Sequence, residues 1–234
     1  MLSRGLLGAS LAAAAVLASV LIAVSVISAN SSASERPDVT ATEFAGDPAL
    51  LRGVPQDGAV LGARGAPVTL VEYADLQCPY CAQWARAALP ELVRDYVRPG
   101  RVRIEFRGLA FLGPDSEVAL RAAIAAGQQD RLWDVVHLLY ANQGAENTGW
   151  VTQELLDGIA AAVQGLNGGR MLGQRWTPQV ERHLVAASDA AERDRIAGTP
   201  AFLAGPTRGK LEPIALSSLD AAPVHAQLDG LLAR

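Results

Sequence analysis

The apolar residues of this chain change their spacing several times, and each change predicts a different element. Residues 66–74 are mostly apolar and β-branched, which predicts a strand buried on both faces. Residues 82–97 repeat apolar side chains at helical spacing, with Pro90 expected to kink the helix. Residues 101–107 alternate apolar and polar side chains, as in a strand with one more polar face. Together these segments predict a β-α-β unit.

Amphipathic segments after this unit predict a group of helices. Asp115 or Ser116 is expected to cap the first of them, and Thr177 with Pro178 the last. A glycine-rich link, residues 165–173, is expected to separate the last two. The helices are expected at residues 115–126, 133–140, 151–163 and 177–195.

The C-terminal part of the chain predicts a hairpin and a closing helix. Residues 196–204 have the pattern of a turn that leads into a strand, and residues 211–216 that of the return strand. Leu228, Leu231 and Leu232 mark a last helix. The predicted fold class is therefore α/β.

The N-terminal part predicts a membrane segment. Residues 6–29 carry no charge, and a spanning helix needs about 18 or more apolar residues, which favours a retained signal anchor within residues 1–30. Arg4 is the only positive side chain on the short N-terminal flank, so the remaining chain is expected on the extracytoplasmic side of the cell membrane. The alternative is a cleaved signal peptide and a secreted or periplasmic protein. Residues 31–60, rich in small and polar residues, are expected to form a flexible tether.

Composition narrows the function classes. The chain has 234 residues, half of them hydrophobic, which suits one globular domain, expected at residues 61–234. A net charge of −4, with no block of basic residues, provides no surface for a phosphate backbone. Nucleic acid is therefore not an expected partner.

Both cysteines of the chain lie in the motif Cys78-Pro79-Tyr80-Cys81, at the expected start of a helix. A zinc site would need two more ligands, and no second cysteine pair or close histidine pair exists, so no metal is expected. A purely structural disulfide would close a very short loop and constrain the unfolded chain little. These two alternatives are weaker than a redox-active pair.

The redox interpretation has a physical basis at the helix N-terminus. Unpaired backbone N–H groups and the positive end of the helix dipole stabilise a thiolate, and in such motifs the cysteine pKa falls from about 8.5 to roughly 3.5–7.5. A stabilised thiolate favours the reduced form, so the disulfide becomes more oxidising. Cys78 is expected to be the attacking sulfur, and Cys81 the one that resolves the mixed disulfide. A Cys78–Cys81 disulfide is expected in the isolated protein.

The motif and the later Gly198-Thr199-Pro200 resemble the DsbA-like branch of the thioredoxin-fold oxidoreductases, over most of residues 61–234. The resemblance implies a thioredoxin-like fold with a helical insertion at about 115–195, and Pro200 in a cis-proline loop beside the cysteines. It also implies that Glu72 is a buried carboxyl that assists proton transfer to Cys81. The alternative for Glu72 is an ordinary surface strand residue. Asp75 is assigned to the turn.

The resemblance implies a protein thiol:disulfide oxidoreductase without a cofactor. The leading hypothesis is a dithiol oxidase that introduces disulfides into exported proteins and is reoxidised by a quinone-linked membrane partner of the DsbB or VKOR kind. The alternatives are a reductase or isomerase of the same fold, or a membrane-tethered protein that binds peptides without redox turnover. The dipeptide between the cysteines does not decide the redox direction.

Overall fold

A six-stranded mixed sheet forms the centre of the protein in the computed structural model, which describes residues 46–234. Its strands lie in the order β1-β2-β4-β3-β5-β6. The central strand β3 pairs in parallel with β4 and antiparallel with β5, and all eight of its residues are buried, as the unbroken apolar run predicts. The strands are β1 Gln56–Asp57, β2 Val60–Leu61, β3 Val68–Asp75, β4 Val102–Leu109, β5 Ala201–Pro206 and β6 Glu212–Ile214.

Helices cover both faces of this sheet. On one face Leu70 of β3 shares a core with Trp84 of α2 and Val224 of α9. On the other face Tyr73, which points the opposite way along the same strand, packs with Ala191 of α8. The helical segments are α2 Pro79–Ala87, α3 Leu89–Leu92, the π-helical η2 Val93–Val97, α4 Pro114–Gly127, α5 Leu132–Ala141, α6 Gln153–Ala162, α7 Gly168–Gln174, α8 Pro178–Asp194 and α9 Ala222–Leu232.

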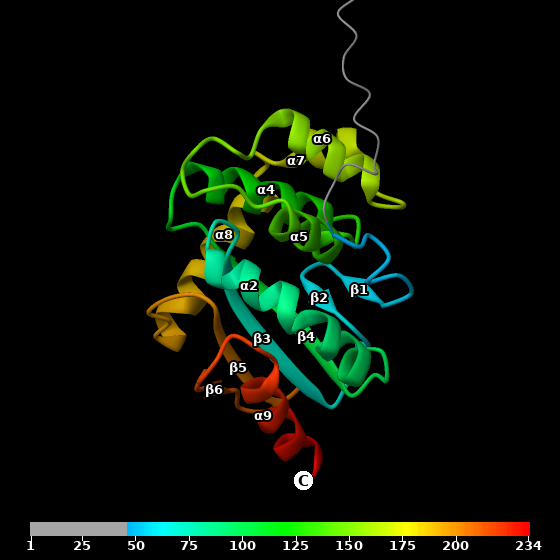
Figure 1. Cartoon of the computed structure of the whole chain (residues 1–234), viewed down its shortest axis with the longest axis vertical. Helices are drawn as coiled ribbons and strands as arrows, with labels where there is room; N and C mark the ends of the chain where they lie inside the picture. Colours follow the sequence, from blue (N-terminus) through cyan, green and yellow to red (C-terminus); the bar gives the residue numbers. More distant parts are fainter. Residues whose placement is uncertain (1–45) are drawn as a thin grey trace, which may run out of the picture. The chain divides into compact units, whose positions relative to one another are not determined.

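The helices α4–α8 are inserted between β4 and β5, so the expected helical insertion is confirmed. Figure 1 shows α4, α5, α6 and α7 together beyond the end of the sheet at which β3 and β4 finish. The same end carries the start of α2, which follows β3 directly. The insertion therefore lies against the turn that contains the cysteines.

Several local predictions differ from the structure. The helix expected at residues 82–97 is interrupted at Ala88, between α2 and α3, in line with the kink expected at Pro90, which has no N–H for the helical ladder. Its last part differs from the expectation, since it is the π-helical η2. Neither Asp115 nor Ser116 caps α4, whose first turn begins with Pro114 after Gly113. Their side chains bind backbone and side-chain groups of other segments instead.

The glycine-rich link contains a helix that the sequence did not predict. Asn167 caps α7 by accepting a hydrogen bond from the Arg170 N–H, and Met171 is fully buried. Three glycines within seven residues obscure the helical pattern, so capping and one apolar contact determine the local structure. A second feature, the hairpin of β1 and β2, lies in the segment expected as tether.

The predicted signal anchor at residues 1–30 lies outside the described residues. From residue 46 to the C-terminus, no helix has both the length and the hydropathy that crossing a bilayer requires.

Candidate active site

The cysteine motif forms the start of α2, directly after β3. Cys78 is the N-cap residue, with extended backbone angles, and Pro79 occupies the first helical turn, where the missing N–H costs no hydrogen bond. Both cysteines are thiols in this structure. Cys78 is 5% exposed and Cys81 is fully buried, whereas Tyr80 is 60% exposed. A partner can therefore reach the edge of Cys78 beside Tyr80, but it cannot reach Cys81.

The loop after α8 completes the site from the other side. Helix α8 ends at Arg195, which adopts the left-handed conformation, and the chain then reaches Thr199 and Pro200, joined by a cis peptide bond as expected. The Cys78 Sγ lies 3.4 Å from the Thr199 carbonyl oxygen, to which the thiol donates. The Thr199 hydroxyl is buried and has no hydrogen-bond partner among the described residues. The structure thus brings together two motifs about 120 residues apart in sequence.

The two thiols have opposite acidities. A hydrogen bond from the Cys81 thiol, the Thr199 side chain, and the backbone N–H groups of Cys81 and Tyr80 favour the thiolate and lower the pKa of Cys78 to about 6, against some opposition from burial. Burial, reinforced by the neighbouring Cys78 thiolate, raises the pKa of Cys81 far above that of an ordinary thiol. At neutral pH the pair therefore holds one thiolate, on Cys78, and one proton, on Cys81.

Glu72 is a buried carboxyl under the same helix. It is only 1% exposed, and burial raises its pKa to about 8, so it is mostly protonated at neutral pH. It pairs in register with Phe202 on the neighbouring strand β5, and the Phe202 ring packs on Trp84 of α2 with ring centroids 4.4 Å apart. Tyr140 is electrostatically coupled to both Cys81 and Glu72. The alternative of a surface strand residue is therefore wrong.

The segment that links β3 to the motif, residues 75–78, is here called the catalytic turn. Asp75 at its start is fully buried, and its carboxylate accepts hydrogen bonds from several groups. Gln77 is also buried, and its side-chain amide bonds to two residues of the insertion. The donors to the Asp75 carboxylate are the N–H groups of Gln77 at 2.8 Å, Phe111 at 3.0 Å and Leu112 at 3.2 Å, and the Ser116 hydroxyl at 2.6 Å.

The sequence assigned Asp75 to the turn and gave no role to Gln77. A signal was present, because two polar residues interrupt an otherwise apolar run directly before the motif. Their partners could not be found from the sequence, since they lie on the β4–α4 loop, α4 and the α5–α6 loop. Burial of polar groups requires such partners, so the network is specific to this arrangement of elements.

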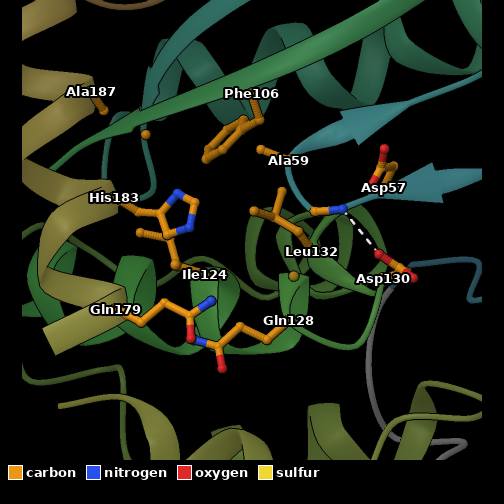
Figure 2. Close-up of a pocket in the computed structure, with 13 residues that line it drawn as sticks. Asp57, Ala59, Phe106, Ile124, Gln128, Asp130, Leu132, Gln179, His183 and Ala187 are labelled. Carbon is orange, nitrogen blue, oxygen red and sulfur yellow. Dashed lines mark hydrogen bonds between the residues drawn. The ribbon is translucent and has the colours of Figure 1, made fainter. Parts of the chain in front are cut away.

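A cavity of about 240 Å³ lies apart from this site. Its lining includes Phe106 of β4, Gln128 after α4, and Gln179 and His183 of α8. Figure 2 shows Gln128 and Gln179 approaching each other, with His183 and Phe106 above them. None of the catalytic turn, the cysteine motif or the cis-proline loop lines it. Over residues 46–234 no group of three or more His, Cys, Asp or Glu side chains is arranged to hold a metal.

Known proteins are similar to this chain in sequence and in fold. The family model described as thioredoxin matches residues 55–219. The probable disulfide bond formation protein D of Bacillus anthracis is 29% identical over 143 residues, which are 60% of this chain and 66% of that protein. Oxidised BdbD from Bacillus subtilis superposes with a TM-score of 0.65 at 23% identity, over 77% of this chain and 98% of that one. For alpha-DsbA1 from Wolbachia pipientis the TM-score is 0.64 at 18% identity, over 75% and 90%.

These matches differ in what they show. The two solved structures are similar in fold, including the helical insertion, and so confirm the predicted thioredoxin-like architecture. The chain spans just under two thirds of the length of the Bacillus anthracis relative. The family model covers well over half of the chain, including the cysteine motif and the cis-proline loop. The chain therefore belongs to the thioredoxin family, and its structural neighbours are DsbA-like proteins.

Proposed function

We propose that this protein is a thiol:disulfide oxidoreductase that introduces disulfides into client proteins outside the cytoplasm. The observation that carries the proposal is the difference in acidity between two adjacent thiols, with the pKa of Cys78 lowered to about 6 and that of Cys81 strongly raised. A merely structural pair of cysteines needs no such difference. Thiol–disulfide exchange requires this difference in pKa, because one sulfur must be a good leaving group and the other a protonated thiol.

The reaction begins with the Cys78–Cys81 disulfide. A client thiolate attacks the Cys78 Sγ, and the Cys81 sulfur leaves as a thiolate that takes up a proton at once because of its raised pKa. A second client thiolate then attacks the client sulfur of the mixed disulfide and releases Cys78 as a thiolate. The client loses two electrons and gains a disulfide, and the enzyme is left as the dithiol.

Glu72 is the proposed proton donor to Cys81. Its carboxyl lies beneath α2 and is mostly protonated at neutral pH, because burial raises its pKa to about 8. A proton held at this place is available when Cys81 leaves, and the resulting carboxylate can take a proton back when the enzyme is reoxidised. Pro200 and Thr199 close the other side of Cys78, and the exposed Tyr80 is the proposed first contact for the client.

The direction of transfer follows from thiolate stability. Structural disulfides of secreted proteins have potentials below about −300 mV, so an enzyme disulfide with a potential well above this value oxidises the corresponding dithiols downhill. The lowered pKa of Cys78 stabilises the reduced enzyme and raises its potential. This favours the oxidase over a reductase or isomerase.

The proposed setting is extracytoplasmic, since disulfides persist outside the reducing cytosol. The printed name of the Bacillus anthracis relative, a probable disulfide bond formation protein, supports this choice. We propose a single-pass anchor at residues 1–30, or a cleaved signal in its place, followed by a tether that ends before the folded catalytic domain, which includes Leu51 and the β1–β2 hairpin. Exported proteins with cysteine pairs are the proposed clients, and a quinone-linked membrane protein of the DsbB or VKOR kind is the proposed reoxidant.

Stoichiometric exchange tests the proposal. The oxidised full chain is mixed with a reduced peptide that carries two cysteines, and the thiols on each partner are counted. One client disulfide should form for each enzyme molecule reduced. The absence of any transfer would contradict the proposed function.

Two variants test the separate roles of the thiols. Cys81→Ser, offered an oxidised client, should retain it as a mixed disulfide on Cys78, because no second thiol resolves the complex. Cys78→Ser should form no such complex, since Cys81 is buried and protonated. Equal trapping by both variants would show that the assignment of the attacking sulfur is wrong.

A further inference from the structure

The helical insertion holds the catalytic turn through four residues, here called the insertion clamp. They are Ser116, Tyr140, Gln143 and Asn147. Two of them act on main-chain carbonyls, and two act on the side chains of Asp75 and Gln77. All of them come from α4, from α5 or from the loop that follows α5.

The carbonyls of the catalytic turn accept hydrogen bonds from Tyr140 of α5 and from Gln143 of the loop that follows α5. The Tyr140 hydroxyl donates to the Asp75 carbonyl at 3.3 Å, and this carbonyl also accepts from the Cys78 N–H at 3.0 Å. The Gln143 side-chain amide donates both to the Leu76 carbonyl at 2.8 Å and to the Cys78 carbonyl at 3.2 Å. Three of the four carbonyls in the turn therefore have a donor from the insertion.

The side chains of the turn are held from α4 and the α5–α6 loop. Ser116 donates to the Asp75 carboxylate at 2.6 Å and accepts from the Gln77 amide at 3.0 Å. The Asn147 N–H donates to the Gln77 Oε1 at 2.7 Å, and the Gln77 Nε2 donates to the Asn147 Oδ1 at 3.2 Å. Every polar group of these buried side chains is thus engaged by the insertion or by the turn itself.

We infer that the insertion clamp positions Cys78 and thereby makes the disulfide more oxidising. The reason lies in the difference between the two redox states. In the oxidised protein the covalent bond to Cys81 holds the Cys78 sulfur in place. In the dithiol form this bond is absent, and the backbone of the turn, together with weaker contacts to the Cys81 thiol and Thr199, holds the sulfur opposite the N–H groups of Tyr80 and Cys81, which stabilise the thiolate. A clamp on that backbone therefore stabilises the reduced form more than the oxidised form.

Helix α2 is tied to the same part of the insertion. Arg86 of α2 donates to the Tyr140 carbonyl at 2.8 Å, so α5 contacts the helix as well as the turn that precedes it. Tyr140 is only 1% exposed, and the nearby Cys81 contributes electrostatically to the raised pKa of its hydroxyl. In the described hydrogen bonds none of the four residues contacts a cysteine sulfur, and they act on Cys78 through the turn, as positioning residues.

The inference rests on the proposed function and is tested on the full chain with Tyr140→Phe, Gln143→Met and the double variant. Each protein is equilibrated with glutathione, and the Cys78 pKa is taken from the pH dependence of its alkylation. Each single variant should lower the equilibrium constant for oxidising glutathione about threefold. The double variant should lower it about tenfold, which is about 30 mV for a two-electron couple. The Cys78 pKa should rise in all three.

A matched control separates positioning from stability. Tyr96→Phe removes one tyrosine hydroxyl, which donates to Asp229 at 2.8 Å, from a buried residue on η2. This variant should unfold at a lower temperature, but its equilibrium constant for oxidising glutathione and its Cys78 pKa should remain those of the wild type. Asn147→Gly offers a further variant that should fold, because Asn147 is exposed and has a φ of 57°, which glycine adopts freely. Asn147→Gly should also lower the equilibrium constant for oxidising glutathione.

The inference is overturned if the folded Tyr140→Phe, Gln143→Met and Asn147→Gly variants all keep the wild-type constant and Cys78 pKa. It is also overturned if Tyr96→Phe shifts both as much as they do. A wild-type chain that exchanges no disulfide with a client would instead contradict the proposed function. In that case the Cys78 pKa of the variants would still decide whether the clamp acts.

Discussion

Cys78 and Cys81 differ in acidity because three features act on them unequally. The hydrogen bond from the Cys81 thiol favours the charge on Cys78, the N–H groups at the start of α2 face Cys78, and burial acts most strongly on Cys81. The motif predicts the second of these features, since a helix N-terminus is visible in the sequence. The approach of the Thr199–Pro200 loop was implied by the family resemblance, whereas the full burial of Cys81 depends on the packed fold.

Glu72 offers a prediction at the residue scale. Glu72→Gln keeps the size of the side chain but removes the proton that Cys81 is proposed to receive. Client oxidation at pH 7 should become about a hundredfold slower, which is the lower end of the range for general acid catalysis. Rates are compared at equal concentrations of client thiolate, by stopped-flow fluorescence.

The pH profile provides the control for Glu72. The wild-type rate, corrected for client thiolate, should fall as the pH rises through about 8, because Glu72 loses its proton there. The Glu72→Gln profile should lack this fall. If both proteins gave the same rate and the same profile, Glu72 would have no part in proton transfer.

At the scale of elements, the strands and helices that follow a strong apolar pattern were predictable. The buried run gives β3, the alternating run gives β4, and Thr177 with Pro178 starts α8 as expected. Elements held by capping and long-range contacts were not predictable, as α7 shows. The same holds for the catalytic turn, whose buried polar partners come from the insertion.

Gly113 tests the contact between the β4–α4 loop and the α5–α6 loop. It has a φ of 149°, and a Cβ at this position would collide with the Asn147 side chain. Gly113→Ala should therefore lower the free energy of unfolding by about 1–3 kcal/mol, the cost of a strained backbone position. Urea unfolding measures the difference.

Gly173, near the end of α7, is the control position for Gly113. No atom lies within 4 Å of a Cβ placed there, and its φ is not positive. Gly173→Ala should leave the stability unchanged or raise it by up to about 1 kcal/mol, because alanine favours the helix. Equal destabilisation by both substitutions would contradict the role given to the Gly113–Asn147 contact.

At the scale of the whole molecule, stability should depend on pH differently in the two redox states. The pKa of Glu72 is raised from 4.5 to about 8, so the folded protein holds a proton that the unfolded chain has lost, and stability falls as the pH rises through this range. The pKa of Cys78 is lowered from 9.0 to about 6, so its thiolate adds stability as the pH rises between these values. Only the reduced protein has this second contribution.

Urea unfolding at pH 6 and pH 8 checks this difference. The oxidised protein should lose up to about 3 kcal/mol between the two values, at about 1.4 kcal/mol for each pH unit. The reduced protein should lose much less, because the contributions of Glu72 and Cys78 have opposite signs there. Oxidised Glu72→Gln should show no such loss. Parallel curves for the two redox states would contradict the lowered pKa of Cys78.

The reduction potential of the full chain, measured in glutathione buffers, tests the proposed oxidase most directly. Thioredoxin, whose reactive thiol has a pKa of about 7, has a potential of about −270 mV. The pKa of Cys78 is about 6, and one unit is worth about 30 mV for two electrons. A disulfide-introducing enzyme built on Cys78 should therefore have a potential above about −240 mV. A value of about −270 mV or lower would contradict this and identify the protein as a reductase.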